Sequence, residues 1–581
     1  MVTIYEDKDS SYQPDQDINT PPARQIEPVK SKINGPTDGL SAFINTFLSE
    51  YEQNLREKHA PVEATIKVSE LLGKLARLYE RVRNTVEYKG EHVLRRNAIE
   101  RILRRLVWEQ QTALAPKPLL VSGIDVNHIA ETLLKELVRA RYLPNSTIPT
   151  SKIGEVERVI EKYLYLLKQL KNLPSSIPVA KSTDWIWGVA SSEIEDLVDP
   201  SNRELYVRLM YDWFVSYFDW GEADIPESER LLQIYLAIHR AYPKSDDPIM
   251  RFHLLLRKHP SWRKAEEKDV NKFTERFPEI YKEIESDLNF KGKYSLYRKI
   301  QRYAAAFEIF HAIAEDEKSG LQSLLLNEGR LEDKIRNVCE KKYKLIRARV
   351  NTGIVRSIVY IFITKVVFAL LIEVPYEIFR FGDVRYLPLT LNIMIPPIAM
   401  WAIGFSIKIP AEKNTHQIIA RLKSVVYESE SGAKHAFSIA QGKAKSTLAK
   451  IFTVVYAALF VLVFGTIAYL LLKIHFTLLG IIIFFGFMSL VLLFAFRVRF
   501  SAEQLKVEAE EEGFFGHLFS YLTLPFLNFG FYLSKGLAKL NFFTILLDFL
   551  IEAPLKSIIE VFEEWTSFLR QKKEEVVEMP E

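Results

Sequence analysis

The sequence has little cysteine and none of the common catalytic motifs. Cys339 is the single cysteine among 581 residues, which excludes an internal disulfide and cysteine-based metal sites and suits a reducing compartment. The sequence contains no G-x-x-x-x-G-K-[ST], H-E-x-x-H or G-x-S-x-G motif. Of the scattered histidines, His253 and His259 are six residues apart and fall on different faces of a helix. We therefore expect no catalytic residue, no metal site and no cofactor, and we favour a non-enzymatic protein.

The chain also lacks an excess of one charge and an apolar segment near its start. Its 77 basic residues nearly balance 73 acidic residues, which argues against a dedicated nucleic-acid binder. Residues 1–38 are rich in Pro, Asp, Gln, Ser and Thr, so we predict a disordered polar tail. This tail has no apolar core of a cleavable signal. We therefore expect later helices to direct membrane insertion.

Residues 39–349 carry charges every few positions and show helical hydrophobic periodicity. One apolar stripe consists of Val93, Leu94, Ile99, Ile102, Leu103 and Leu106. Prolines such as Pro144, Pro174 and Pro243 separate successive helical stretches. No stretch alternates polar and apolar residues as a half-buried strand would. The pattern predicts an all-α cytosolic domain with a sub-boundary near 173–183.

The second half contains apolar runs that are long enough to cross a bilayer, which needs about 20 residues per helix. We predict a transmembrane region at 350–511 with about four helices, at 357–374, 386–407, 451–472 and 477–496. The first run contains Lys365, which costs about 2.5 to 3.5 kcal/mol at mid-membrane. The surrounding Leu, Ile, Val and Phe residues each return about 0.3 to 0.6 kcal/mol, so insertion remains favourable.

The distribution of Lys and Arg predicts the orientation of these helices. Basic residues are frequent before the first run, in the segment 409–450 and after the fourth run, and sparse in the other two connections. Because basic loops stay in the cytosol, we expect the N-terminal domain and the segment 409–450 to be cytosolic. The bilayer is a prokaryotic cytoplasmic membrane in our preferred interpretation, with an organelle membrane as the alternative.

Residues 512–581 are less apolar than the four runs. The stretch 514–533 has no formal charge but includes Pro525, Asn528 and Gly530, so we predict interfacial or re-entrant helices rather than a fifth span. A final amphipathic helix is expected near 553–573. Four residues mark the interfacial helices, namely Asp548, Glu552, Lys556 and Trp565.

Two groups of residues are candidates for function. Within the predicted spans these are Lys365, Glu373, Asn392, Pro396 and Pro397. Ionisable residues in a bilayer serve an ion path or pair with each other to fix helix packing, and adjacent prolines break or kink a helix. In the helical domain the candidates for an anionic-lipid or partner surface are Arg95, Arg96, Arg101, Arg104 and Arg105. The alternative for this arginine group is an ordinary solvated face.

The sequence predicts an all-α membrane protein: a cytosolic helical domain, a polytopic bundle and amphipathic C-terminal helices. The leading functional hypothesis is a membrane-anchored scaffold that binds a protein partner or a second copy of itself through its helical domain. The alternative is an ion or solute transporter, channel or translocation subunit that uses the polar residues in its spans. A third interpretation, a lipid-handling enzyme, would need an acid or nucleophile near Asp548 or Glu552.

Overall fold

The computed structural model describes most of the chain between Gly39 and Lys539. The described residues are 39–58, 64–68, 91–113, 124–172, 177–199, 203–219, 225–427, 435–436, 446–507 and 514–539, with 561, 565, 568–569 and 572–573. The predicted tail at 1–38 lies outside them, as do Asp548, Glu552 and Lys556.

The described part of the chain is helical, which confirms the predicted all-α class. A two-residue parallel pairing joins Phe218 to His435 and Asp219 to Ala436. The elements are α1 (Ala42–Lys58), α3 (Glu91–Ala113), α4 (Val126–Arg139), α5 (Lys152–Asn172), α6 (Val179–Val198), α7 (Arg203–Tyr217), β1 (Phe218–Asp219), α8 (Glu227–Ala241), α9 (Asp247–Lys258), η3 (Pro260–Lys264), α10 (Glu267–Glu275), α11 (Phe277–Leu288), α12 (Lys293–Glu317), η4 (Lys318–Gly320), α13 (Leu321–Leu325), α14 (Glu328–Phe368), the π-turn η5 (Ala369–Glu373), α15 (Val374–Phe381), α16 (Tyr386–Phe405), α17 (Glu412–Tyr427), β2 (His435–Ala436), α18 (Ser446–Lys473), α19 (Leu478–Ala502) and α20 (Phe514–Lys539).

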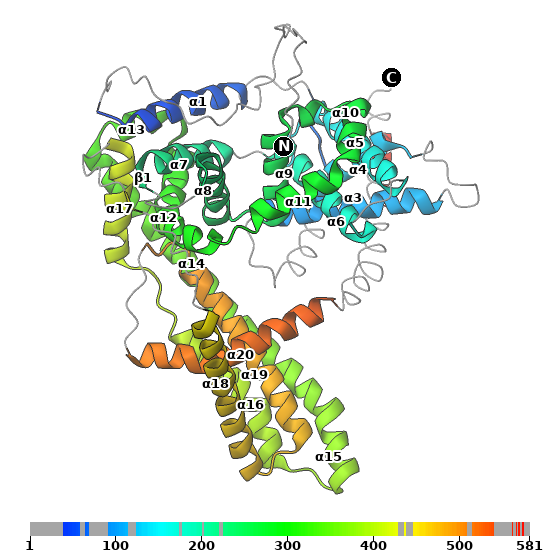
Figure 1. The fold of residues 1–581 in the computed structure, drawn as a ribbon, viewed down its shortest axis with the longest axis vertical. Helices are drawn as coiled ribbons and strands as arrows, with labels where there is room; N and C mark the ends of the chain where they lie inside the picture. The colour runs from blue at the N-terminus through cyan, green and yellow to red at the C-terminus, as the bar shows by residue number, and fades with distance from the viewer. Residues whose placement is uncertain are drawn as a thin grey trace, which may run out of the picture.

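The helices up to α13 form a helical domain that lies at one end of the molecule (Figure 1). One continuous hydrophobic cluster runs through it and includes buried residues on both sides of the predicted sub-boundary at 173–183, such as Leu166 and Ile186. Polar side chains fix the helix starts. Asp125 and Asp246 accept hydrogen bonds from the backbone at the N-termini of α4 and α9, which satisfies donors that a helix leaves unpaired.

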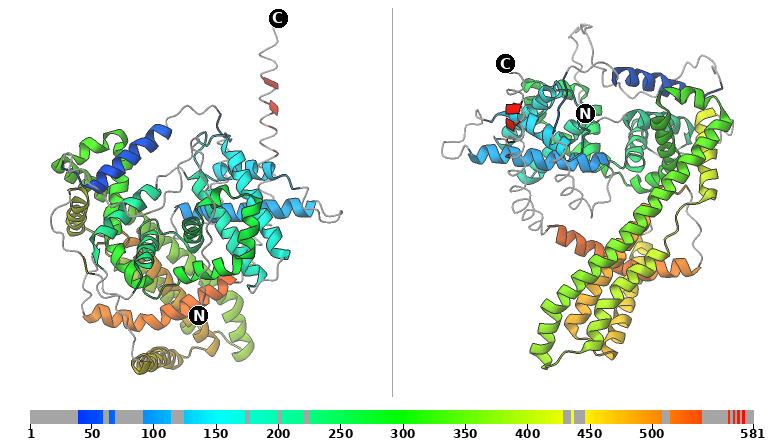
Figure 2. Two further views of the ribbon diagram at one scale, coloured as in Figure 1. Left: turned by 45° about the horizontal axis from the view of Figure 1, so that its top comes forward. Right: turned by 180° about the vertical axis from the view of Figure 1, so that it is seen from behind.

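Helix α14 connects the helical domain to the apolar bundle. It begins at the N-cap Asn327 and continues through the π-turn and α15 to Phe381, a helical stretch of 54 residues, or about 80 Å at 1.5 Å per residue. Its first turns contribute Leu331 and Ile335 to the domain core, and its later turns contribute Val350 to a cluster in the bundle. Figure 2 shows α14 running without interruption from domain to bundle. Helix α14 therefore links the helical domain directly to the bundle.

Two later segments return to the helical domain. Helix α17, in the predicted cytosolic segment 409–450, places Ile418 and Leu422 in the domain core, and Ser41 donates a hydrogen bond of 2.7 Å from its Oγ to the Val425 carbonyl. Val507, which follows α19, also joins this core. The segments after α16 and α19 therefore lie on the same side of the bundle as the domain.

Four helical stretches are long and apolar enough to cross a membrane: Glu328–Phe381, Tyr386–Phe405, Thr453–Lys473 and Leu478–Ala502. They agree with the four predicted runs, although the first extends well beyond 357–374 at both ends. Helix α16 is not broken at Pro396 and Pro397, which are buried inside it. Neighbouring helices let membrane helices tolerate proline in this way.

Helix α20 crosses the bundle instead of running along it (Figures 1 and 2). It packs against α18 and α19, and its Phe526 ring stacks on Phe464 with 4.7 Å between centroids. A Cβ atom at Gly530 would lie 2.5 Å from the Ser489 carbonyl oxygen. Only glycine therefore permits this close approach of α20 to α19.

Candidate functional site

The polar residues predicted within the spans lie together in the bundle. The Lys365 ammonium is 2.9 Å from Glu373 Oε1, and Asn392 Nδ2 donates a hydrogen bond of 2.7 Å to Glu373 Oε2. All three side chains are at most 5 % exposed. Asn392 Nδ2 is also 3.3 Å from the Gly480 carbonyl, so the cluster connects α14, the π-turn, α16 and α19.

The π-turn helps to bring the two charges together. On a regular α-helix, residues eight apart are rotated by about 80° from each other. The π-turn at Ala369–Glu373 widens the helix and reduces the rotation between Lys365 and Glu373. It ends two residues before Pro375, whose ring crowds the preceding turn and which lacks a backbone donor. Such turns are frequent at functional sites.

The cluster contains one unsatisfied polar atom. Asn392 Oδ1 is buried and has no hydrogen-bond partner among the described residues. The Lys365 ammonium also lies 4.7 Å from the ring centre of Phe487, a cation–π contact. The cluster therefore combines a neutralised ion pair with one buried group that has unused hydrogen-bonding capacity.

The arginine group on α3 faces acidic neighbours within the domain. Arg95 and Arg96 are 3 % and 5 % exposed, and Arg95 pairs with Glu195 at 2.6 Å and Asp199 at 2.7 Å. Burial, reinforced by the charge of Asp199 and opposed by Arg95, raises the pKa of Glu195 to about 7. Buried side chains cannot reach a lipid headgroup in this conformation, so the expectation of a lipid-facing surface does not hold for Arg95 or Arg96.

The other members of the arginine group are nearer the surface. Arg104 pairs with Glu100 at 2.7 Å and Asp184 at 2.9 Å, and Arg105 pairs with Glu136 at 2.5 Å. Arg101 also has an interaction within the chain. Recruitment of lipid or a partner by these residues stays a prediction. It would compete with existing ion pairs.

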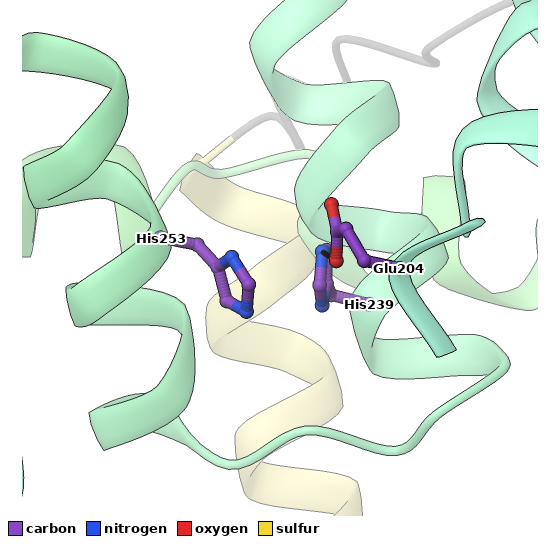
Figure 3. Close-up of side chains that lie close together, drawn as sticks. All are labelled: Glu204, His239 and His253. Carbon is purple, nitrogen blue, oxygen red and sulfur yellow. Dashed lines mark ion pairs between the residues drawn. The ribbon is translucent and has the colours of Figure 1, made fainter. Parts of the chain in front are cut away.

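A second polar cluster, not anticipated from the sequence, lies in the helical domain. Glu204 on α7, His239 on α8 and His253 on α9 bring one potential ligand atom each to within 4.8 Å of the others (Figure 3). The sequence predicts no metal site, and no short motif joins His253 to the other two residues. One sequence feature could have pointed to this cluster, namely a histidine among the apolar residues of α8. In the structure this residue, His239, is 2 % exposed.

Comparisons with known proteins identify no relative of this chain. No protein-family model, curated protein or solved structure matches this chain. The four apolar helices nevertheless indicate a membrane protein. Of the residues predicted to mark the C-terminal interfacial helices, only Trp565 is described, and it is helical and 56 % exposed.

Proposed function

We propose that this chain is a membrane-anchored interaction protein without enzymatic activity, in which a four-helix bundle holds the helical domain against a bilayer. The observation that carries the proposal is the continuity of α14, which contributes buried residues to the domain core and to the bundle core. A rigid connection of this kind fixes the distance and orientation of the domain relative to the membrane. With a flexible linker, both the distance and the orientation of the domain would vary.

Two further contacts support a fixed attachment. Asn414 on α17 donates a hydrogen bond of 2.8 Å to the Leu505 carbonyl and accepts one of 2.8 Å from the Val507 backbone. The chain thus meets the domain three times, through α14, α17 and the segment after α19. In our proposal this side is the cytosol, because it carries the basic residues that favour cytosolic loops.

The proposal predicts a stoichiometric protein partner or a homo-oligomer formed through residues 40–350. A photo-crosslinking residue at Tyr294, which is 70 % exposed on the domain, is compared in native membranes with one at Phe379, which is 91 % exposed on α15. We expect a defined protein adduct from position 294 and lipid adducts from position 379. A monodisperse monomer with no adduct at position 294 or at other exposed domain positions would contradict the proposal.

A second candidate function, ion translocation, is favoured by the unpaired Asn392 Oδ1 beside the Lys365–Glu373 pair. Polar groups with unused bonding capacity inside a bundle can solvate a proton or a small cation. Flux into proteoliposomes is measured for the wild type and for the double variant Lys365→Met/Glu373→Gln. Flux that disappears in the variant supports a path, and flux that is absent or unaltered leaves the pair with a packing role.

A further inference from the structure

The cluster of Glu204, His239 and His253 comes from three successive helices of the domain. Figure 3 shows the two imidazole rings and the carboxylate converging from α7, α8 and α9. The His239 and His253 ring centres are 4.6 Å apart. Ring packing alone could produce this distance, so the orientation of the nitrogen atoms decides what the cluster can bind.

Hydrogen bonds orient both rings in the same way. His239 Nδ1 is 3.3 Å from Ser245 Oγ, and His253 Nδ1 is 3.2 Å from the Tyr235 hydroxyl. The Tyr235 hydroxyl donates its single proton to Glu204 Oε1 at 3.0 Å, so on this network it accepts from His253 Nδ1. Assigned in this way, both imidazoles keep a lone pair on Nε2. Metal-binding histidines show the same arrangement, with the second ring nitrogen donating to a neighbouring oxygen.

The free ends of His239 and Glu204 have a spacing suited to metal ligands. His239 Nε2 lies 3.6 Å from Glu204 Oε2, close to the roughly 3.4 Å that separates two ligands about 2.0 to 2.1 Å from a tetrahedral zinc ion. His239 Nε2 is also buried without a hydrogen-bond partner among the described residues. A buried acceptor without a partner is unfavourable, and a bound cation would satisfy it.

We propose that Glu204, His239 and His253 bind one divalent transition-metal ion of the Zn²⁺ class, a site independent of the membrane-anchoring role. Two imidazoles and one carboxylate suit such ions, whereas Mg²⁺ and Ca²⁺ prefer oxygen ligands. The Glu204 side chain is 48 % exposed in the described structure. Three protein ligands leave a coordination position open to water.

The test uses the full-length protein in detergent, without a histidine tag, stripped of metal and titrated with Zn²⁺ against a competing chelator. We expect one ion per chain, and binding weakened at least about 100-fold in Glu204→Gln and in His253→Gln. His128→Gln is the matched control, because His128 is an exposed histidine of the same domain outside the cluster, and it should bind like the wild type. Zn²⁺ should also raise the unfolding temperature of the wild type and of this control only.

The proposal is overturned if the wild type binds no stoichiometric Zn²⁺, or if both cluster variants bind it as the wild type does. Either result would make the histidines a packed neutral pair. Because Glu204 is half-exposed, Glu204→Gln should keep the fold even if His253→Gln does not. A folded Glu204→Gln variant with unchanged affinity and an unchanged Zn²⁺-dependent rise in unfolding temperature therefore contradicts the site on its own.

Discussion

Lys365 Nζ lies 2.9 Å from Glu373 Oε1 in the interior of the bundle, and these side chains are 0 % and 5 % exposed. Removing one partner of a buried ion pair leaves the other charge uncompensated, which costs about 3 to 5 kcal/mol. We therefore expect Lys365→Met and Glu373→Gln to lower the unfolding temperature in detergent strongly when made singly.

The double variant Lys365→Met/Glu373→Gln should recover most of that loss, because it removes both charges and leaves an amide oxygen that Asn392 can still donate to. Thermal unfolding of all four proteins completes a double-mutant cycle. Losses that simply add in the double variant would show that the two residues do not act as a pair.

The close approach of α20 to α19 predicts a difference between two glycines of one helix. Gly530→Ala places a Cβ atom against the Ser489 carbonyl oxygen, whereas a Cβ at Gly536 meets nothing within 4 Å. We expect Gly530→Ala to destabilise the bundle by about 1 to 3 kcal/mol. Gly536→Ala should be neutral or stabilise by up to about 1 kcal/mol, since alanine favours helix. Equal unfolding temperatures for the two variants would contradict the contact with Ser489.

One polar side chain joins α17 to the exit of α19. Asn414→Ala removes the hydrogen bonds to the Leu505 carbonyl and from the Val507 backbone, which should cost about 2 kcal/mol. Limited proteolysis should then cleave faster after Ala502. The neighbouring exposed Lys413→Ala is the control and should behave like the wild type. Unchanged proteolysis in Asn414→Ala would argue against this attachment.

Buried Glu195 predicts a pH dependence of domain stability. Its folded-state pKa of about 7 lies above the ordinary glutamate value of 4.5, so folding favours the protonated form. The contribution of protonated Glu195 to the unfolding free energy is fully present below about pH 4.5 and is lost as the pH rises through about 7.

Between pH 5 and pH 8 the wild type should therefore lose about 1 to 3 kcal/mol of unfolding free energy relative to Glu195→Gln. Denaturant unfolding of both proteins at the two pH values measures this difference. A difference that stays constant with pH would contradict the raised pKa.

The features that the sequence predicted are local. The charge-free runs at 451–472 and 477–496 needed no knowledge of neighbours, because bilayer length and apolar composition define a spanning helix. Lys365 and Glu373 were grouped because both are ionisable residues within one predicted apolar run. The helical class of the domain likewise followed from hydrophobic periodicity.

The features that the sequence did not predict depend on distant contacts. Ser41 and Val425 are hydrogen-bonded although 384 positions separate them, so the place of α17 in the domain core could not be derived from its own residues. The local sequence favours a surface position for Arg95, whereas its buried partner Glu195 lies 100 positions away. Glu204 and His239 likewise come together only through the packing of separate helices.

The central claim is that the domain, α17 and the exit of α19 share one side of the membrane, with the short connections after α15 and α18 on the other. In a Cys339→Ser background, single cysteines replace the exposed residues Asp383, His475, Glu340 and His416, and intact cells are treated with an impermeant maleimide. The account predicts labelling from outside at 383 and 475 only. Labelling at 340 or 416, or at just one of the distal positions, would contradict it.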